Sequence, residues 1–262
     1  METKQITNRS LSPLRGLGAF IRTLLLSIFG LKTYLKIISS LYICGVSRNM
    51  WKSKYPELFY LDTILKQGDT CIDIGANLGY YSTRMAKNVG TNGKVYAVEP
   101  IPLFGEIWKR NMRSFNNAEL LPYALGEKTD TVQMGIPIKN GRLHHGMTKI
   151  TSSAHENYST TFDVPMRNPD ELFAYVEKLD FVKCDVEGYE FHVFSNFTKT
   201  LQRCKPLVQS ELSGTENRKA VIALFKSLGY KLHILRNGNL HTISLDEALQ
   251  VEQDFYFKSP AP

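Results

Sequence analysis

Short apolar runs alternate with segments of helical period from about residue 57 to residue 258. Apolar runs that end at glycine, proline or an acidic residue are typical of buried strands, and apolar positions that recur every three or four residues indicate helices. This alternation predicts an α/β fold with helices on both faces of a mainly parallel sheet. The expected strands are residues 70–74, 94–99, 120–124, 181–184, 207–210 and 254–258, with a hairpin of 230–235 and 240–243 around Asn237-Gly238.

The rest of the α/β region is predicted to contain one additional extended segment, a polar loop and several helices. Residues 131–136 are predicted to form an additional extended segment that ends at Pro137, because proline cannot donate a hydrogen bond to a neighbouring strand. Residues 139–161 are predicted to be a polar loop that carries several histidines. The expected helices are residues 57–66, 80–88, 103–115, 170–178, a short one from Tyr189, and 216–228.

The N-terminal segment has a different pattern. Residues 17–46 are apolar apart from a polar stripe at helical spacing, which predicts an amphipathic helix broken near Gly30. Arg22, Lys32 and Lys36 interrupt the apolar positions, so no uncharged run approaches the ~20 residues of a membrane-spanning helix. Two interpretations stay open: the apolar face lies on a membrane surface or a lipid-like substrate, or it packs on the rest of the protein. We therefore divide the chain into an N-terminal helical segment, residues 1–55, and an α/β domain, residues 56–262.

Composition narrows the class of protein. The 262 residues carry a net charge of +7, but the Lys and Arg residues are scattered without a long basic run. Basic charge is compatible with nucleic acid, an anionic membrane surface or an acidic substrate, so it does not by itself indicate RNA binding. The four cysteines contain no C-x-x-C pair, which favours a reducing compartment and argues against a zinc site. We expect a cytoplasmic protein, with peripheral contact to the inner face of a membrane through residues 17–46 as a further possibility.

The most informative motif joins the first two expected strands. The first strand ends in Asp73-Ile-Gly75-Ala-Asn77-Leu-Gly79, and the second ends in Glu99. A glycine turn before a helix and a carboxylate on the next strand form a nucleotide pocket at the carboxyl ends of an open sheet, where the carboxylate can accept both hydroxyls of a ribose. The glycine spacing matches neither the G-x-G-x-x-G of dinucleotide sites nor a phosphate-binding loop.

A second motif places charged side chains at the same edge of the sheet. Lys183, Asp185 and Glu187 lie at the carboxyl end of the strand at 181–184, and Glu211 follows the strand at 207–210. Carboxylates that converge beside a cofactor pocket can act as a general base or hold a metal ion. The metal candidates are Asp185, Glu187 and Glu211, whose oxygen ligands would suit magnesium or calcium.

Together these motifs resemble the FkbM family of S-adenosylmethionine (SAM) dependent methyltransferases over about residues 57–258. The resemblance is carried by D-x-G-A-N-x-G-Y-Y, V-x-A-V-E-P, A-L-G-E at 124–127 and D-F-V-K-C-D-V-E-G-Y-E. It implies a class I, Rossmann-like methyltransferase sheet, SAM as cofactor, and O-methylation of sugars or other hydroxyl-bearing metabolites. The cofactor-binding residues that it implies are Asp73, Gly75, Ala76, Asn77, Gly79, Glu99, Pro100 and Ala124.

The resemblance also places Asp185 and Glu187 at the reaction end, and more weakly a His145-Gly146 loop. Phe194-Ser-Asn-Phe197 departs from the family's usual Leu-x-Gly-Ala, and the first 50 residues lie outside the shared pattern, so the acceptor stays open. Methyl transfer to oxygen requires an acceptor held in line and a group that removes its proton. Asp185 is the first candidate for this base and His145 the second.

Three functions follow as hypotheses. The leading one is a SAM-dependent O-methyltransferase that acts on a hydroxyl of a glycan, a lipid-linked sugar or a related metabolite. The alternatives are an RNA or protein methyltransferase, and a SAM-binding or membrane-associated protein without catalysis. The [ND]-P-P-[YFW] signature of amino-methylating nucleic-acid enzymes is absent, since Asp185-Val-Glu-Gly stands in its place, so nucleic acid is not an expected partner.

Overall fold

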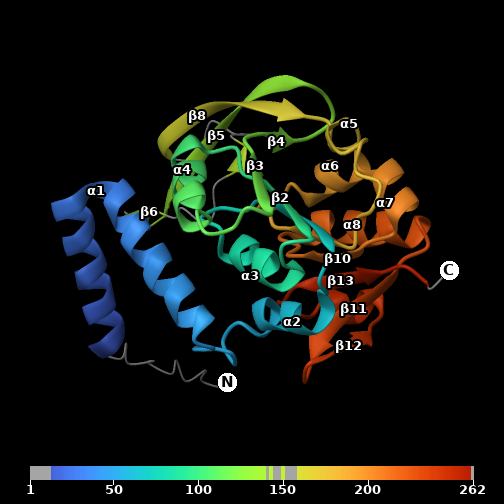
Figure 1. The fold of residues 1–262 in the computed structure, drawn as a ribbon, viewed down its shortest axis with the longest axis horizontal. Coiled ribbons are helices and arrows are strands. Elements are labelled where there is room, and N and C mark those ends of the chain that lie inside the picture. The colour runs from blue at the N-terminus through green and yellow to red at the C-terminus, as the bar shows by residue number, and fades with distance from the viewer. Residues whose placement is uncertain (1–12, 140–141, 144–148, 151–157, 261–262) are drawn as a thin grey trace, which may run out of the picture.

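The computed structural model describes residues 13–139, 142–143, 149–150 and 158–260. Its centre is an eight-stranded sheet in which β3, β2, β1, β9 and β10 run parallel, β13 is antiparallel to β10, and β11 and β12 complete the edge (Figure 1). In spatial order the strands are β3 (Ala118–Leu121), β2 (Lys94–Val98), β1 (Thr70–Ile74), β9 (Phe181–Cys184), β10 (Leu207–Ser210), β13 (Phe255–Lys258), β11 (Lys231–Arg236) and β12 (Asn239–Thr242).

Helices cover both faces of this sheet, because successive residues of each strand point to opposite sides. In β1, Cys71 packs with Leu61 and Met85 on one face, and Ile72 packs with Phe194 and Phe225 on the other. The expected Rossmann-like sheet with helices on both faces is therefore confirmed. The first face carries α2 (Pro56–Ile64), α3 (Tyr80–Val89) and α4 (Pro102–Asn111), and the second carries α5 (Pro169–Leu172), α6 (Glu190–Ser195), α7 (Thr198–Cys204) and α8 (Thr215–Ser227); α9 (Leu245–Ala248) follows β12.

A smaller sheet differs from the sequence prediction. The chain expected to form one strand at 120–124 belongs to two sheets, because β3 ends at Leu121 and Ala124 begins β4. Pro137 does not end the extended segment: the strand continues past it, with a register shift between Ile136 and Pro137. This sheet contains β4 (Ala124–Leu125), β8 (Tyr158–Arg167), β5 (Asp130–Lys139), β6 (Arg142–Leu143) and β7 (Lys149–Ile150).

Two other predictions were wrong in the same region. The start of β8 had been predicted as loop and its remainder was missed, although Phe162, Val164 and Met166 alternate with exposed polar or proline residues, as in a half-buried strand. The helix expected at 170–178 ends at Leu172. The apolar residues after Leu172 are buried between the sheet and α7 but are not helical. Their helix-like spacing therefore arose from burial and not from a helix.

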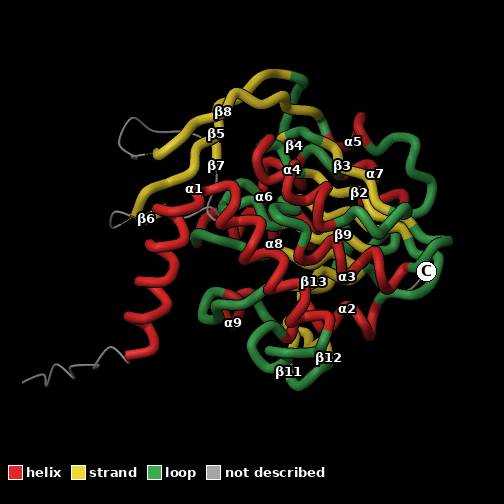
Figure 2. Tube along the Cα trace, turned by 60° about the vertical axis from the view of Figure 1, so that its left-hand side comes forward, coloured by secondary structure: helices red, strands yellow, loops and turns green. Residues whose placement is uncertain are grey.

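The N-terminal helix α1 (Pro13–Ser47) is broken at Gly30, as expected, where φ is +70° and the backbone leaves the helical region. It folds back there into two arms, and the second arm lies against the α/β domain beside α4 (Figures 1 and 2). Tyr34 and Leu35 of this arm are buried in a cluster with Leu78, Phe104 and Ile107. The apolar face of the second arm therefore packs on the domain.

Both arms of α1 carry apolar side chains that are exposed to solvent. Ile28, Phe29 and Leu41 are exposed, whereas Lys32 pairs with Glu106 at 2.7 Å. Within the described residues, no helix is both long and apolar enough to cross a membrane.

We expect Leu35→Ala to lower the free energy of unfolding by about 2–4 kcal/mol, because it leaves a cavity in a packed cluster. Leu41→Ala, on the same helix with its side chain 65% exposed, is the matched control and should change stability by less than about 0.5 kcal/mol. Urea unfolding of both variants measures the difference. Equal small losses would show that the second arm does not contribute to the stability of the domain.

Candidate active site

A cavity lies at the carboxyl ends of β1, β2 and β9, with about 630 Å³ of atom-free space including solvent at its mouth. Residues expected from the sequence form much of its wall, and apolar side chains such as Phe104 and Met134 form the rest. The expected residues that line it are Gly75, Asn77, Glu99, Pro100, Ala124, Asp185 and Glu187.

The turn after β1 brings two strand ends into direct contact. The N–H groups of Gly75 and Ala76 both donate to the Val98 carbonyl at 3.0 Å, and the Asp185 N–H donates to the Ile74 carbonyl at 3.0 Å. Gly75 has a φ of +79°, and a Cβ there would overlap the carbonyl oxygen of Asp185. Glycine is therefore required at position 75 by both its conformation and its surroundings.

Glu99 fixes the loop that faces the cavity. Its two carboxylate oxygens each accept one backbone N–H at 2.8 Å, from Asn77 and from Ile101. Burial, with a smaller contribution from the negative charge of Asp73, raises the pKa of Glu99 to about 7, and the two N–H donors only partly offset this rise. Each oxygen keeps one lone pair for a ligand hydroxyl.

The cavity also contains polar capacity that the protein does not use. The Oδ1 atom of Asn77 is buried and has no hydrogen-bond partner among the described residues. Buried polar atoms in native proteins are rarely left unpaired, so this oxygen indicates a ligand that supplies a donor. The half-used Glu99 carboxylate, the orphaned Asn77 oxygen and the apolar walls fit a nucleoside such as that of SAM.

Three of the expected cofactor residues lie behind the cavity wall. The Asp73 carboxylate accepts from the Ser82 hydroxyl at 2.5 Å, and Ser82 accepts from the Trp108 indole N–H at 2.8 Å. Ala76 belongs to the core on the helix side, and a Cβ on Gly79 would press against the Trp108 ring. These residues hold β1, α3 and α4 together, and they shape the loop from behind.

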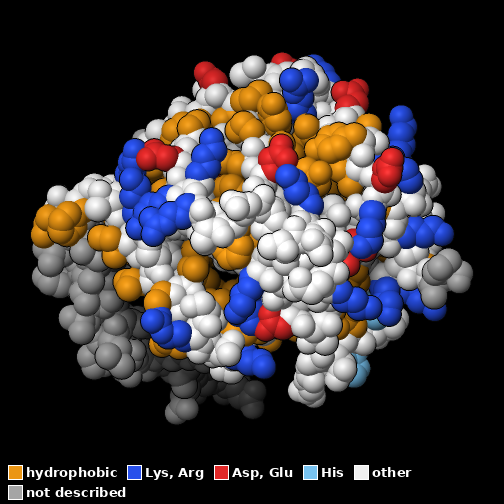
Figure 3. Space-filling view, viewed as in Figure 1, with side chains coloured by type: hydrophobic (Ala, Val, Ile, Leu, Met, Phe, Trp, Pro, Cys, Tyr) orange, Lys and Arg blue, Asp and Glu red, His pale blue; other side chains and the backbone are white. Residues whose placement is uncertain are grey.

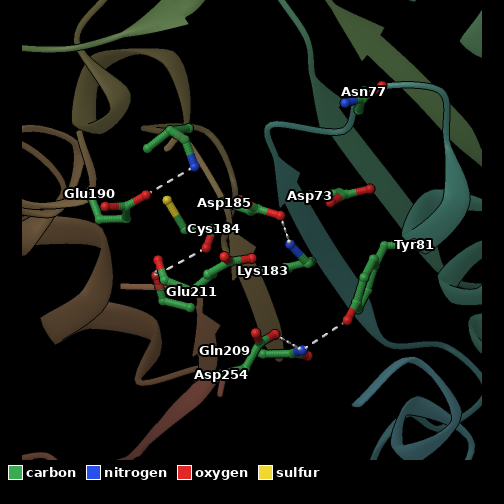
Figure 4. A network of polar contacts seen from close by, with 12 residues as sticks. Asp73, Asn77, Tyr81, Lys183, Cys184, Asp185, Glu190, Gln209, Glu211 and Asp254 are labelled. Carbon is green, nitrogen blue, oxygen red and sulfur yellow. Dashed lines mark hydrogen bonds and ion pairs between the residues drawn. The ribbon is translucent and has the colours of Figure 1, made fainter. Parts of the chain in front are cut away.

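Lys183 holds Asp185, one of the residues that line the cavity (Figure 4). Its ammonium group is buried, donates to the Asp185 carboxylate at 2.9 Å and lies 4.5 Å from the centre of the Tyr81 ring. Burial lowers its pKa, but the negative charges of Asp185, Asp254 and Asp73 outweigh this and hold the pKa above its ordinary value. Lys183 is therefore charged and holds Asp185 in one orientation.

Sequence reasoning missed the residues that complete this network. Asp254 accepts from the Gln209 amide at 2.6 Å, and the same amide nitrogen lies 3.2 Å from the Tyr81 hydroxyl (Figure 4). Asp73, Lys183, Gln209 and Tyr256 are paired across neighbouring strands and point to the same face. Polar residues at equivalent positions of several apolar strands were a usable signal, but only once the register was known.

The loop after β9 depends on a further residue that was quoted in the motif without a role. One oxygen of buried Glu190 accepts from the N–H groups of Val186 and Gly188, both at 3.1 Å, and the other accepts from the Asn217 amide at 2.5 Å. Between these donors, Glu187 has a φ of +55°, which is unusual for a residue with a side chain. Glu190 thus stabilises the conformation that places Glu187 at the cavity.

The metal hypothesis gains no support from the arrangement of the carboxylates. Asp185 is already bonded to Lys183, and Glu211 does not line the cavity. Partial burial, followed by repulsion from Asp185 and Asp254, raises the pKa of Glu211 to about 7. Within the part of the chain that the structure describes, no three His, Cys, Asp or Glu side chains are placed to hold a metal ion. His145 lies outside the described residues.

Comparison with known proteins agrees with this geometry. The family model of the methyltransferase FkbM domain matches residues 73–232, which is more than half of the chain. A crystal structure of an FkbM methyltransferase from Methylobacillus flagellatus is similar with a TM-score of 0.46 and 15% identity, over 72% of this chain and 43% of that one.

Two curated relatives match a short part of the chain. A protein-L-isoaspartate O-methyltransferase of Caenorhabditis elegans is 35% identical over 63 residues, and one of Ignicoccus hospitalis is 34% identical over 59 residues. These matches cover 24% and 22% of this chain. The chain spans 28% of the length of each relative.

We expect Gly75→Ala to destabilise the protein and to abolish SAM binding, because the new Cβ overlaps the Asp185 carbonyl. Gly229→Ala is the matched control: its φ is +84° but nothing lies within 4 Å of the added atom, so it carries only the conformational cost of about 1–2 kcal/mol. The loss at Gly75 should exceed that at Gly229 by about 2 kcal/mol or more in urea unfolding. Equal losses would mean that the two strand ends are not in contact.

We expect SAM affinity to rise by about tenfold between pH 6 and pH 8, because a carboxyl with a pKa near 7 becomes a full acceptor for ligand hydroxyls over this range. The stability of the protein without SAM should change in the opposite direction. The folded state binds the Glu99 proton more tightly than the unfolded chain does, so this contribution to the free energy of unfolding is lost as pH rises from about 4.5 through 7. Calorimetric titrations measure the affinity.

The Glu99→Gln variant should bind SAM weakly, and its affinity should not rise between pH 6 and pH 8. Glu211→Gln removes the other carboxyl with a pKa near 7 and should keep the native profile. A Glu99→Gln variant with the native pH profile would exclude Glu99 as the titrating group.

Proposed function

The chain belongs to the FkbM methyltransferase family, and from this premise we propose that it methylates a hydroxyl group of a glycan, a lipid-linked sugar or a related metabolite. SAM-dependent methyl transfer is the activity of the family; the oxygen acceptor and its class are the proposal. When bound, SAM supplies a methyl group that is already electrophilic because its sulfur carries a positive charge. The chain therefore has two tasks, to position the acceptor and to take up its proton.

The observation that carries this proposal is the Asp185 carboxylate at the cavity. One of its oxygens is bonded to Lys183, so the side chain is fixed while the other oxygen stays available. A fixed carboxylate beside the reaction site can accept the proton of a hydroxyl as the new carbon–oxygen bond forms. Glu187 lines the same cavity and is a second acidic group for binding hydroxyl donors.

The local relatives offer support for oxygen as the accepting atom. Both are named O-methyltransferases, and they match 24% and 22% of this chain. Their own substrate is a modified protein, and an RNA or protein acceptor remains the second candidate. We favour a hydroxyl-bearing small molecule, glycan or glycolipid, because the cavity mouth presents carboxylates and no [ND]-P-P-[YFW] signature is present.

We place the enzyme in the cytoplasm, with peripheral contact to the inner face of the membrane through the exposed side of α1. The exposed side chains of Ile28, Phe29 and Leu41 support this contact. It would use the side of the helix that does not pack on the domain.

We expect Asp185→Asn to lower the turnover number by about 10²–10⁴-fold and to leave SAM affinity nearly unchanged, because it removes the proton acceptor and keeps the side-chain shape. Labelled SAM is supplied with glycolipid, soluble-metabolite, protein and RNA fractions of the native cells, and transfer of label is followed. Asp246→Asn removes an exposed carboxylate of α9 and should match the native protein.

Label in the glycolipid or metabolite fraction that depends on Asp185 supports the proposal. Label in protein or RNA would favour the second candidate. Native turnover by Asp185→Asn would exclude this residue as the base, whatever the acceptor.

A further inference from the structure

A second groove lies between the second arm of α1 and the end of α4, away from the cavity described above. It has about 960 Å³ of atom-free space, solvent at its mouth included. Arg48, Arg110 and Arg113 line it, together with the hydroxyl-bearing side chains of Ser40, Ser47 and Ser114. No acidic residue contributes to its wall.

The surroundings of this groove carry an excess of positive charge. Residues 31–48 and 102–115 contain six Lys or Arg residues and one carboxylate, Glu106. Glu106 is engaged by Lys32 at 2.7 Å and lies 3.7 Å from Lys36. Basic side chains gather over α4 and the adjoining arm of α1 (Figure 3). Across the described residues, no ion pair reaches any of the three groove arginines.

One guanidinium is already held in place. A single nitrogen of Arg110 donates to the Ser40 hydroxyl at 2.8 Å and to the Lys36 carbonyl at 3.1 Å. The remaining N–H groups of Arg110 keep their donor capacity, in a side chain whose orientation is fixed. A preorganised guanidinium loses less conformational freedom when it binds an anion.

Helix ends give an alternative reason for cations here, because α1 and α4 both end at the groove and their carbonyl groups attract positive charge. Arg48 fits this explanation, since it donates to the Cys44 carbonyl of its own last turn at 3.4 Å. Arg113 does not, because it lies beyond the end of α4 and no hydrogen bond joins it to a described carbonyl. The cluster therefore exceeds what the two helix ends require.

We propose that this groove binds a phosphate or pyrophosphate group. Guanidinium groups match phosphate oxygens in two-point contacts, and three of them suit more than one negative charge. Leu41 lies on the same helical face as Cys44 and Arg48, and its side chain is 65% exposed. An apolar surface beside the anion site favours a phosphate carried by a lipid over a free one. The proposal rests on the fold and is independent of the methyl acceptor.

The first experiment titrates inorganic pyrophosphate into the full chain at low salt by calorimetry. We expect Arg113→Gln to weaken binding by about fivefold, because it removes one exposed arginine contact to the anion. The double variant Arg48→Gln/Arg113→Gln removes two such contacts and should weaken binding by about 25-fold. Lys109→Gln is the matched control: it removes one positive charge from α4 outside the groove and should bind as the native protein does. Circular dichroism melting checks that all variants are folded.

The second experiment identifies the source of the phosphate by flotation with vesicles. One set contains phosphatidylcholine and phosphatidylglycerol in equal parts, and the other contains phosphatidylcholine alone. Flotation with the anionic set that is lost in the double variant and kept in Lys109→Gln supports a lipid phosphate. Pyrophosphate binding with the same pattern but no flotation supports a soluble phosphate. The proposal is overturned if neither probe binds, or if Lys109→Gln weakens binding as much as Arg113→Gln does.

Discussion

The buried ammonium group of Lys183 is the interaction on which the rest of the site depends. A charge inside a sheet is tolerated only where opposite charges and hydrogen bonds compensate the loss of water. Here the compensation comes from Asp73 in β1, from Asp254 just before β13, and from Asp185 just after β9. The Tyr81 ring of α3 closes the fourth side. These elements must therefore meet in one register, and that register is the one that opens the cavity.

The main sheet was predictable from the sequence because its central strands, β1 and β9 above all, are buried on both faces and stand out as apolar runs. The smaller sheet was not, for a physical reason: β8 buries one face only, so its signal is an alternation around Val164 and Met166 rather than a run. The prediction that the strand ends at Pro137 was wrong for a different reason. Proline ends a strand by removing a donor, but at a register shift no donor is needed there.

The candidate site was predictable where chemistry is local in sequence. Gly75 and Glu99 stand at strand ends, and their positions follow from the strand pattern alone. Asp254 and Gln209 could not be found in this way, because they meet Lys183 only through the pairing of β9, β10 and β13. Asp73 belongs to the cofactor motif but does not line the cavity. It supports the loop through its hydrogen bond with Ser82, which in turn accepts from Trp108.

The N-terminal helix links the cavity to the outer surface. Its second arm buries Leu35 against Leu78 and Phe104, so it packs behind the loop that carries Asn77 and behind one wall of the cavity. Packing in such a cluster fixes side-chain positions, because dense interiors transmit small displacements. Arg48, Ser40 and Ser47 of the same arm line the basic groove. One helix thus supports the cavity wall with its apolar face and carries Arg48 of the groove that we propose binds phosphate, so α1 is a structural part of the unit that forms the cavity.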